Sequence, residues 1–129
     1  MDNVITDGSY ESATCGLNLY SFSERLMDTN VNFQVFKMQG SFYLWVGTKP
    51  ETMSNLAVAM KTQFDPEPSS CKVLGKFTDS TSTTLAQKLA KKTGKQVFVS
   101  YNIATEDTMM LPLVEKRIMT EMINCEDKF

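Results

Sequence analysis

A run of hydroxyl side chains followed by lysines is the first stretch of the sequence that could do chemistry. Residues 80–102 are STSTTLAQKLAKKTGKQVFVSYN, in which five hydroxyl residues precede four lysines. A phosphate cradle of the Walker A type needs Gly, four residues and then Gly-Lys-Ser/Thr. Neither Gly75-Lys76 nor Gly94-Lys95 is followed by a hydroxyl residue, so that spacing is missing. The hydroxyls predict instead a capped helix N-terminus, where one cap contributes about 1 kcal/mol, although such a terminus can also hold an anion.

The four lysines of this stretch form a local basic patch. The chain as a whole has a formal net charge of -2, whereas nucleic-acid binding normally requires a strongly basic surface with exposed aromatic side chains. Nucleic acid is therefore not an expected partner. The patch is either the solvated face of a helix or a docking surface for an acidic protein, where charge raises the association rate and fixes the orientation.

Catalysis has few candidate residues in this chain. Histidine is absent, which removes the commonest general base and metal ligand. The three cysteines, Cys15, Cys71 and Cys125, are far apart and lack CxxC spacing, so free thiols in a reducing compartment are expected. Cys71 stands next to Lys72 and is the candidate for thiol chemistry, with an inert thiol as the simpler interpretation. No catalytic residue, metal or cofactor is expected.

The elements that must position these residues are strands and helices in mixed order. Period-two patterns predict strands over residues 15–25, 31–38, 42–47, 71–77 and 96–103, and residues 55–61 fit a strand or, nearly as well, a short helix. Helical patterns cover the lysine run, with Gly94 as its C-terminal cap, and residues 112–124, with Pro112 at the first position.

This order predicts an α+β fold. We expect a six-stranded antiparallel sheet, with a helix before the last strand and a C-terminal helix packed on the sheet. Residues 1–13 carry three acidic residues and no basic one, and they predict a flexible acidic tail. Residues 14–129 are predicted to form a single domain.

The strand predicted over residues 42–47 is apolar on both faces. Phe42 and Leu44 lie on one face, and Tyr43 and Trp45 on the other. A strand of this kind is expected to be covered on both sides, once by its own core and once by a helix or a partner. The nine methionines fit either core filling or an adaptable protein-binding surface.

Several strings of the sequence are similar to those of a known family. Over about residues 17–129 the chain resembles the proteasome assembly chaperone 4 family, a eukaryotic family, through Phe22-Ser23, Arg25-Leu26, Leu44-Trp45-Val46-Gly47, residues 55–60 (NLAVAM), 81–90, 96–102 (QVFVSYN), Leu113-Val114-Glu115, Arg117-Ile118 and Lys128-Phe129.

The resemblance implies a non-catalytic chaperone subunit. Members of the family form a heterodimer with proteasome assembly chaperone 3 by packing of their sheets. The pair binds α-type subunits of the 20S proteasome, notably the fifth, promotes assembly of the α-ring and leaves before the mature core forms. Neither a membrane nor a nucleic acid is implied as a partner. The expected location is the cytoplasm, with the nucleus left open as a second compartment.

The sequence indicates which face of the predicted sheet each candidate interface residue lies on. For chaperone 3 the candidates are one sheet face (Phe33, Val35, Phe42, Leu44) or the opposite one (Tyr43, Trp45), and the predicted register does not choose between them. For the α-type subunit the candidates are Lys88, Lys91, Lys92 and Lys95. Two other interpretations stay open, namely a general adaptor of profilin-like or longin-like layout and a small cytosolic enzyme that uses Cys71 or a carboxylate.

Overall fold

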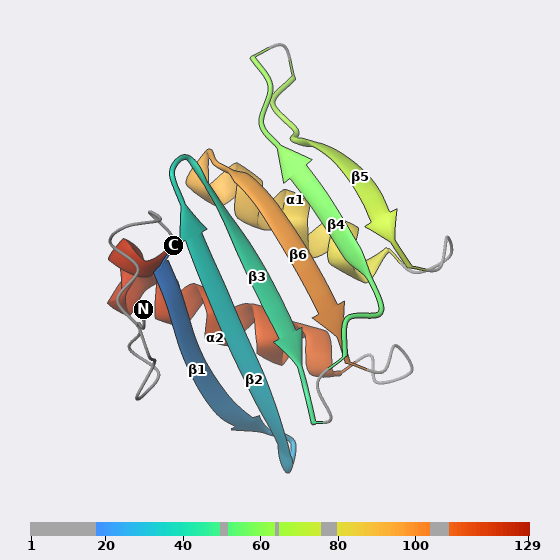
Figure 1. Ribbon diagram of the computed structural model, residues 1–129, viewed down its shortest axis with the longest axis vertical. Helices are drawn as coiled ribbons and strands as arrows, with labels where there is room; N and C mark the ends of the chain where they lie inside the picture. The colour runs from blue at the N-terminus through green and yellow to red at the C-terminus, as the bar shows by residue number, and fades with distance from the viewer. Residues whose placement is uncertain (1–17, 50–51, 64, 76–79, 104–108) are drawn as a thin grey trace, which may run out of the picture.

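The computed structural model describes residues 18–49, 52–63, 65–75, 80–103 and 109–129. A sheet forms one layer and two helices form the other (Figure 1). The elements in chain order are β1 (Asn18–Leu26), β2 (Thr29–Met38), β3 (Ser41–Gly47), β4 (Leu56–Met60), β5 (Ser69–Leu74), α1 (Thr81–Thr93), β6 (Gln96–Asn102), α2 (Met110–Asn124) and the short 3-10 helix η1 (Glu126–Lys128). The tail predicted over residues 1–13 lies outside the described residues.

The six strands pair in the order β1-β2-β3-β6-β4-β5. The α+β class, the six strands and the placement of both helices are confirmed. The sheet is mixed rather than wholly antiparallel, because β3 and β6 run parallel while the other neighbours are antiparallel. The physical reason lies in α1, which returns the chain over the sheet, so that β6 runs in the same direction as β5 and enters between β3 and β4 (Figure 1).

Both helices pack on one face of the sheet, and the core lies between the two layers (Figure 1). Because side chains alternate along a strand, every second residue of the central strands points into this core. Phe33 stacks on Phe22 with ring centroids 4.6 Å apart, and Phe42 meets Phe129 edge to face at 5.7 Å. The fully buried residues of the core include Val31, Phe33, Val35, Phe42, Leu44, Val46, Leu85, Leu89, Val97, Val99, Val114 and Ile118.

Helix ends agree only in part with the sequence-based expectations. Gly94 is left-handed, with φ 72°, and its N–H donates to the Ala90 carbonyl at 2.8 Å, so the predicted C-terminal cap is confirmed. The predicted hydroxyl cap of α1 is wrong, because the N-cap residue Ser80 makes no side-chain capping hydrogen bond. Pro112 is not at the first position either, since α2 begins at Met110. Pro112 is tolerated there because the first N–H groups of a helix have no intrahelical acceptor.

The turn between β1 and β2 stores backbone strain. Met27 and Asp28 both have positive φ, 49° and 64°, a conformation that costs a residue with a Cβ atom about 1–2 kcal/mol. We expect the double substitution Met27→Asn, Asp28→Gly to raise the free energy of unfolding by about 1 kcal/mol, since Asn-Gly is the preferred pair for such a hairpin turn. Urea unfolding measures the change.

A matched control lies in the next hairpin. Gly40 also has a positive φ, 76°, and an added Cβ atom would meet nothing within 4 Å. Gly40→Ala should therefore lower stability through backbone strain alone. Equal unfolding midpoints for the turn variant and the native chain would show that the turn is not strained.

Candidate protein-interaction surface

One row of side chains crosses the helix-free face of the sheet, with one residue from each strand. Each member is the register partner of the next, in the order Leu19, Phe36, Tyr43, Phe98, Val58 and Cys71. We call this set the cross-sheet row. On β2, β3, β6 and β4 its members have the opposite parity to the buried core residues of the same strand, so they point away from both helices. Leu19 and Cys71 continue the row onto β1 and β5 by register. The row is mostly apolar and half-buried, and Leu19 and Cys71 at its ends are exposed.

The middle of the row is aromatic and rigid. The rings of Phe36 and Tyr43 lie 5.8 Å apart at an angle of 50°. Phe98 follows on β6, beside Val58 on β4. Because these side chains stand on paired strands, the hydrogen-bonded sheet fixes their backbone positions. Large aromatic side chains on such a scaffold are typical anchors of protein interfaces.

The structure places the predicted interface residues in different environments. Phe33, Val35, Phe42 and Leu44 are fully buried beneath the helices, which removes them as candidates for partner contact. Tyr43 lies in the cross-sheet row.

Trp45, the other candidate of the helix-free face, is covered by its own chain. Its Nε1 donates to the Thr52 carbonyl at 2.9 Å, and 7% of the residue is exposed. Trp45 therefore borders the row and presents little surface.

Sequence reasoning missed Phe36, Val58 and Phe98 as candidates. The alternation of apolar and polar residues separated Phe36 and Phe98 from the core positions of their strands, and this was the available signal. The alternation does not indicate which of the two sheet faces the helices cover. That choice depends on contacts between elements far apart in the chain.

A buried polar cluster around Asn55 sets the position of β6 beside β4. The Asn55 Nδ2 donates to the Tyr101 carbonyl at 2.5 Å, and its Oδ1 accepts from the Tyr101 N–H at 3.0 Å and from the Ser82 hydroxyl. The Ser100 hydroxyl donates to the Asn55 carbonyl at 2.6 Å. Ser82 therefore tethers α1 to the sheet rather than capping it. The cluster keeps Val58 in register with Phe98.

A second cluster, around Glu121, attaches α2 to β1. The guanidinium of Arg117 contacts the Glu121 carboxylate at 2.6 Å and the Glu24 carboxylate at 2.9 Å, and it lies 4.9 Å from the centre of the Phe22 ring. The Tyr20 hydroxyl donates to the same Glu121 carboxylate. Burial alone would raise the pKa of Glu121, but hydrogen bonds from Tyr20 and Arg117 outweigh it and lower that pKa. Glu121 is therefore held in its charged form.

This cluster predicts a pH dependence of stability. A carboxylate whose pKa is lower in the folded state contributes stability above its unfolded pKa, and that contribution is lost as the pH falls through the folded value. Between pH 7 and pH 3 the unfolding midpoint of the native chain should therefore fall more steeply than that of Glu121→Gln. Urea titrations at each pH measure this. Parallel curves would show that Glu121 does not couple to folding.

The basic patch is partly neutralised by the protein itself. The Lys88 ammonium contacts Glu115 at 3.0 Å, and Lys91 contacts Glu67 at 2.7 Å. Lys95 donates to the Phe129 carbonyl at 2.5 Å, and burial together with the charge of Lys37 lowers the pKa of Lys95. Within the described part of the chain, Lys92 alone of the four has no hydrogen-bond or ionic partner.

Other kinds of site have little support in the described ranges. No helix among them has the length and apolar character to cross a membrane. These residues also hold no group of three or more Cys, Asp or Glu side chains placed to bind a metal ion. Cys71, the candidate thiol, lies on the edge strand β5, and its sulfur contacts the Lys72 carbonyl at 3.6 Å.

Comparisons with known proteins agree on one family. The family model described as proteasome assembly chaperone 4 matches residues 30–103. Proteasome assembly chaperone 4 of Mus musculus is 46% identical over 121 residues, covering 94% of this chain and 98% of the relative. The protein of the same name from Homo sapiens is 46% identical over 123 residues, covering 95% and 99%.

A solved structure shares the fold. One chain in the crystal structure of a chaperone complex for yeast 20S proteasome assembly superimposes with a TM-score of 0.58 and 14% identity. The match covers 84% of this chain and 95% of that one. At this identity the likeness concerns the fold alone.

The mixed sheet, with both helices on one face and the cross-sheet row on the other, defines a two-layer domain of the α+β class. Two comparisons identify the family of this domain. The family model matches more than half of the chain, and the relatives are 46% identical to it over nearly their whole length. The chain belongs to the proteasome assembly chaperone 4 family.

Proposed function

We propose that this chain is a non-catalytic chaperone subunit that pairs with proteasome assembly chaperone 3 through the cross-sheet row. The pair binds α-type subunits of the 20S proteasome, notably the fifth, and promotes assembly of the α-ring before leaving the maturing particle. The expected site of action is the cytoplasm, with the nucleus as a second compartment. The observation that carries the proposal is the row itself, an ordered apolar surface on the face that the helices leave open.

The size of the row suits a stable pairing. Six strands are joined side by side, and neighbouring strands lie about 4.8 Å apart, so the row is about 24 Å long. Together with the flanking side chains of the same sheet face, a row of this length can bury about 800 Å² on each partner, which is the usual size of a specific interface. Transient action then requires only that the pair bind the assembly intermediate more tightly than the finished core.

Copurification from cytosol tests the proposal. The full chain carrying an affinity tag should retain a small partner chaperone and α-type subunits, identified by mass spectrometry, and should retain no mature core. Adding the recombinant partner should also raise the thermal unfolding midpoint of the chain, because binding stabilises the folded state. Recovery of neither a partner chaperone nor a proteasome subunit would refute the proposed function.

The lysines predict a salt-dependent contribution to α-subunit binding. Because Lys92 has no partner among the residues that the structure describes and Lys91 is exposed, we expect the double substitution Lys91→Glu, Lys92→Glu to weaken binding about tenfold, or about 1.4 kcal/mol, at low salt. The effect should shrink as salt screens the charges. Calorimetry at two ionic strengths measures it, with Lys61→Glu as a control for net charge. Unchanged affinity at low salt would remove the lysines from the interface.

A further inference from the structure

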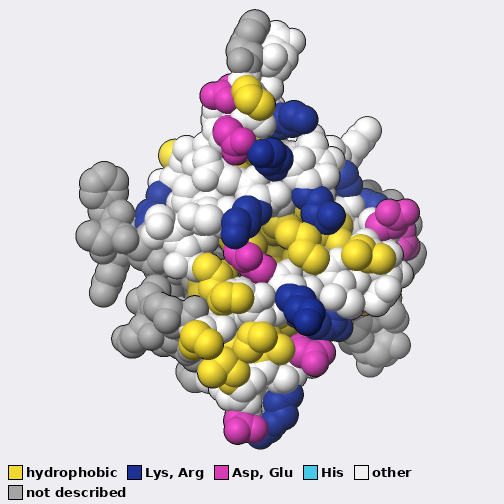
Figure 2. Space-filling model, turned by 180° about the vertical axis from the view of Figure 1, so that it is seen from behind, with side chains coloured by type: hydrophobic (Ala, Val, Ile, Leu, Met, Phe, Trp, Pro, Cys, Tyr) yellow, Lys and Arg dark blue, Asp and Glu magenta, His cyan; other side chains and the backbone are white. Residues whose placement is uncertain are grey.

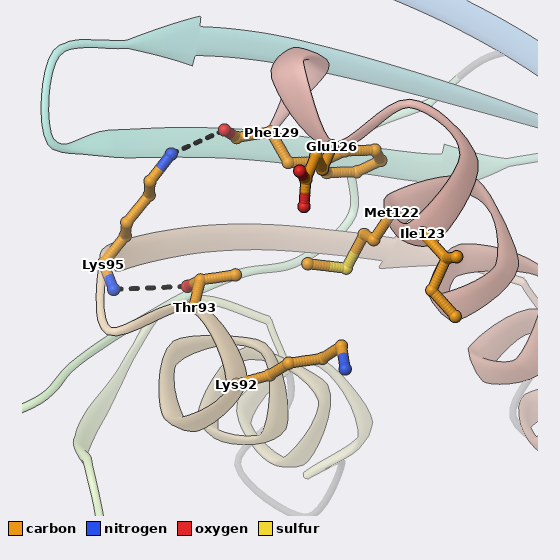
Figure 3. A pocket seen from close by; sticks show the side chains of 7 residues that line it. All are labelled: Lys92, Thr93, Lys95, Met122, Ile123, Glu126 and Phe129. Carbon is orange, nitrogen blue, oxygen red and sulfur yellow. Dashed lines mark hydrogen bonds between the residues drawn. The ribbon is translucent and has the colours of Figure 1, made fainter.

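A hollow of about 460 Å³ lies between the C-terminal ends of the two helices. Lys92, Thr93 and Lys95 line it from the end of α1, and Met122 and Ile123 line it from α2 (Figure 3). We call it the α1–α2 groove. It lies on the helical layer, on the opposite side of the sheet from the cross-sheet row, so both surfaces can be occupied at once.

The floor of the groove is apolar and already packed. Phe129 is 3% exposed and meets Phe42 edge to face, while Met122 is 7% exposed. The rim carries an uncovered apolar side chain, because Ile123 is 73% exposed, the largest exposure among the large hydrophobic residues of the described chain. Hydrophobic side chains gather beside Lys and Arg on this face (Figure 2). A partner side chain that fills the groove would remove Ile123 from water without displacing the core.

The charged side chains that line the groove indicate which kind of partner segment it can bind. Lys92 forms one wall, and Glu126 lies on the other side of the hollow (Figure 3). Lys95 already donates a hydrogen bond to the Phe129 carbonyl, whereas Lys92 has no hydrogen-bond or ionic partner among the described residues. An anion placed against Lys92 would therefore make an ion pair without breaking an existing one.

We propose that the α1–α2 groove binds a short segment of a protein partner in which a large apolar side chain stands next to a carboxylate. The apolar side chain covers Met122, Ile123 and Phe129, and the carboxylate pairs with Lys92. The proposal depends on the proposed function only for the identity of the partner, which would be the α-type subunit that the chaperone pair holds.

Two matched peptides test the groove in the full chain. The probes are Ac-Leu-Phe-Asp-Glu-NH2 and Ac-Leu-Phe-Lys-Lys-NH2, followed by methyl NMR of the Ile and Met side chains. The acidic peptide should shift the Ile123 and Met122 methyl signals and bind at least fivefold more tightly than the basic one. Lys92→Glu should reverse this preference, and Ile123→Asp should abolish binding.

The control is Met109→Asp, at the other end of α2, where the native side chain is 67% exposed. This variant should bind both peptides as the native chain does. Unmoved Ile123 and Met122 signals, or equal affinity for the two peptides, would overturn the proposal.

The outcome can be separated from that of the proposed function. If the peptides bind as expected and no proteasome subunit copurifies, the groove stands and the proposed client is wrong. If α-subunit binding is unaffected by Ile123→Asp and neither peptide binds, the groove is refuted and the chaperone role stands.

Discussion

Replacing Phe98 by aspartate is expected to weaken the proposed pairing with proteasome assembly chaperone 3 by more than a hundredfold, or about 2.7 kcal/mol. Phe98 is in the middle of the cross-sheet row, between Tyr43 on β3 and Val58 on β4. Central aromatic anchors of an interface commonly contribute about 2 kcal/mol or more. The substitution also brings an unpaired carboxylate into a surface that the partner would desolvate. Titration calorimetry with the purified partner measures the loss.

Two controls separate this effect from misfolding. Phe98 lies outside the core cluster between sheet and helices, so the Phe98→Asp chain should keep the native circular dichroism spectrum. Met109→Asp places the same charge at an exposed site on the helical layer and should pair with native affinity. If the folded Phe98→Asp chain also pairs with native affinity, the cross-sheet row is not the interface.

Replacing Asn55 by alanine should lower the free energy of unfolding by about 3 kcal/mol, because it deletes three buried hydrogen bonds and a typical hydrogen bond contributes about 1 kcal/mol. The Asn55 side chain holds both the N–H and the carbonyl of Tyr101 and accepts from Ser82. The substitution removes all three contacts from a site that is 8% exposed. Urea unfolding followed by fluorescence of Trp45, the single tryptophan, measures the change.

The matched control is Asn124→Ala, at an exposed position at the end of α2, which should change stability by less than about 0.5 kcal/mol. Ser82→Ala should cost less than Asn55→Ala, and the double variant should cost less than the sum of the two, because they share one hydrogen-bond network. Equal unfolding midpoints for Asn55→Ala and Asn124→Ala would show that the cluster does not stabilise the fold.

Local patterns in the sequence determined the elements and the family. Alternation predicted most of the strands, although residues 55–61 fitted a short helix nearly as well, and Gly94 marked the end of α1. Side-chain periodicity and left-handed glycine are properties of a few consecutive residues. Alternation also separated Phe36 and Phe98 from the core positions of their own strands. The family strings lie in these same elements, so the class and the family followed without knowledge of the packing.

Only the tertiary structure decided which sheet face the helices cover. It also decided that β6 pairs in parallel with β3, and which partners the polar side chains bind. Ser82 bonds to Asn55 rather than to its own helix, and Lys88 and Lys91 find acidic partners more than twenty residues away. These choices depend on residues that folding brings together from distant parts of the chain. Periodicity specifies which side chains share a face, but only the packing of whole elements specifies what that face meets.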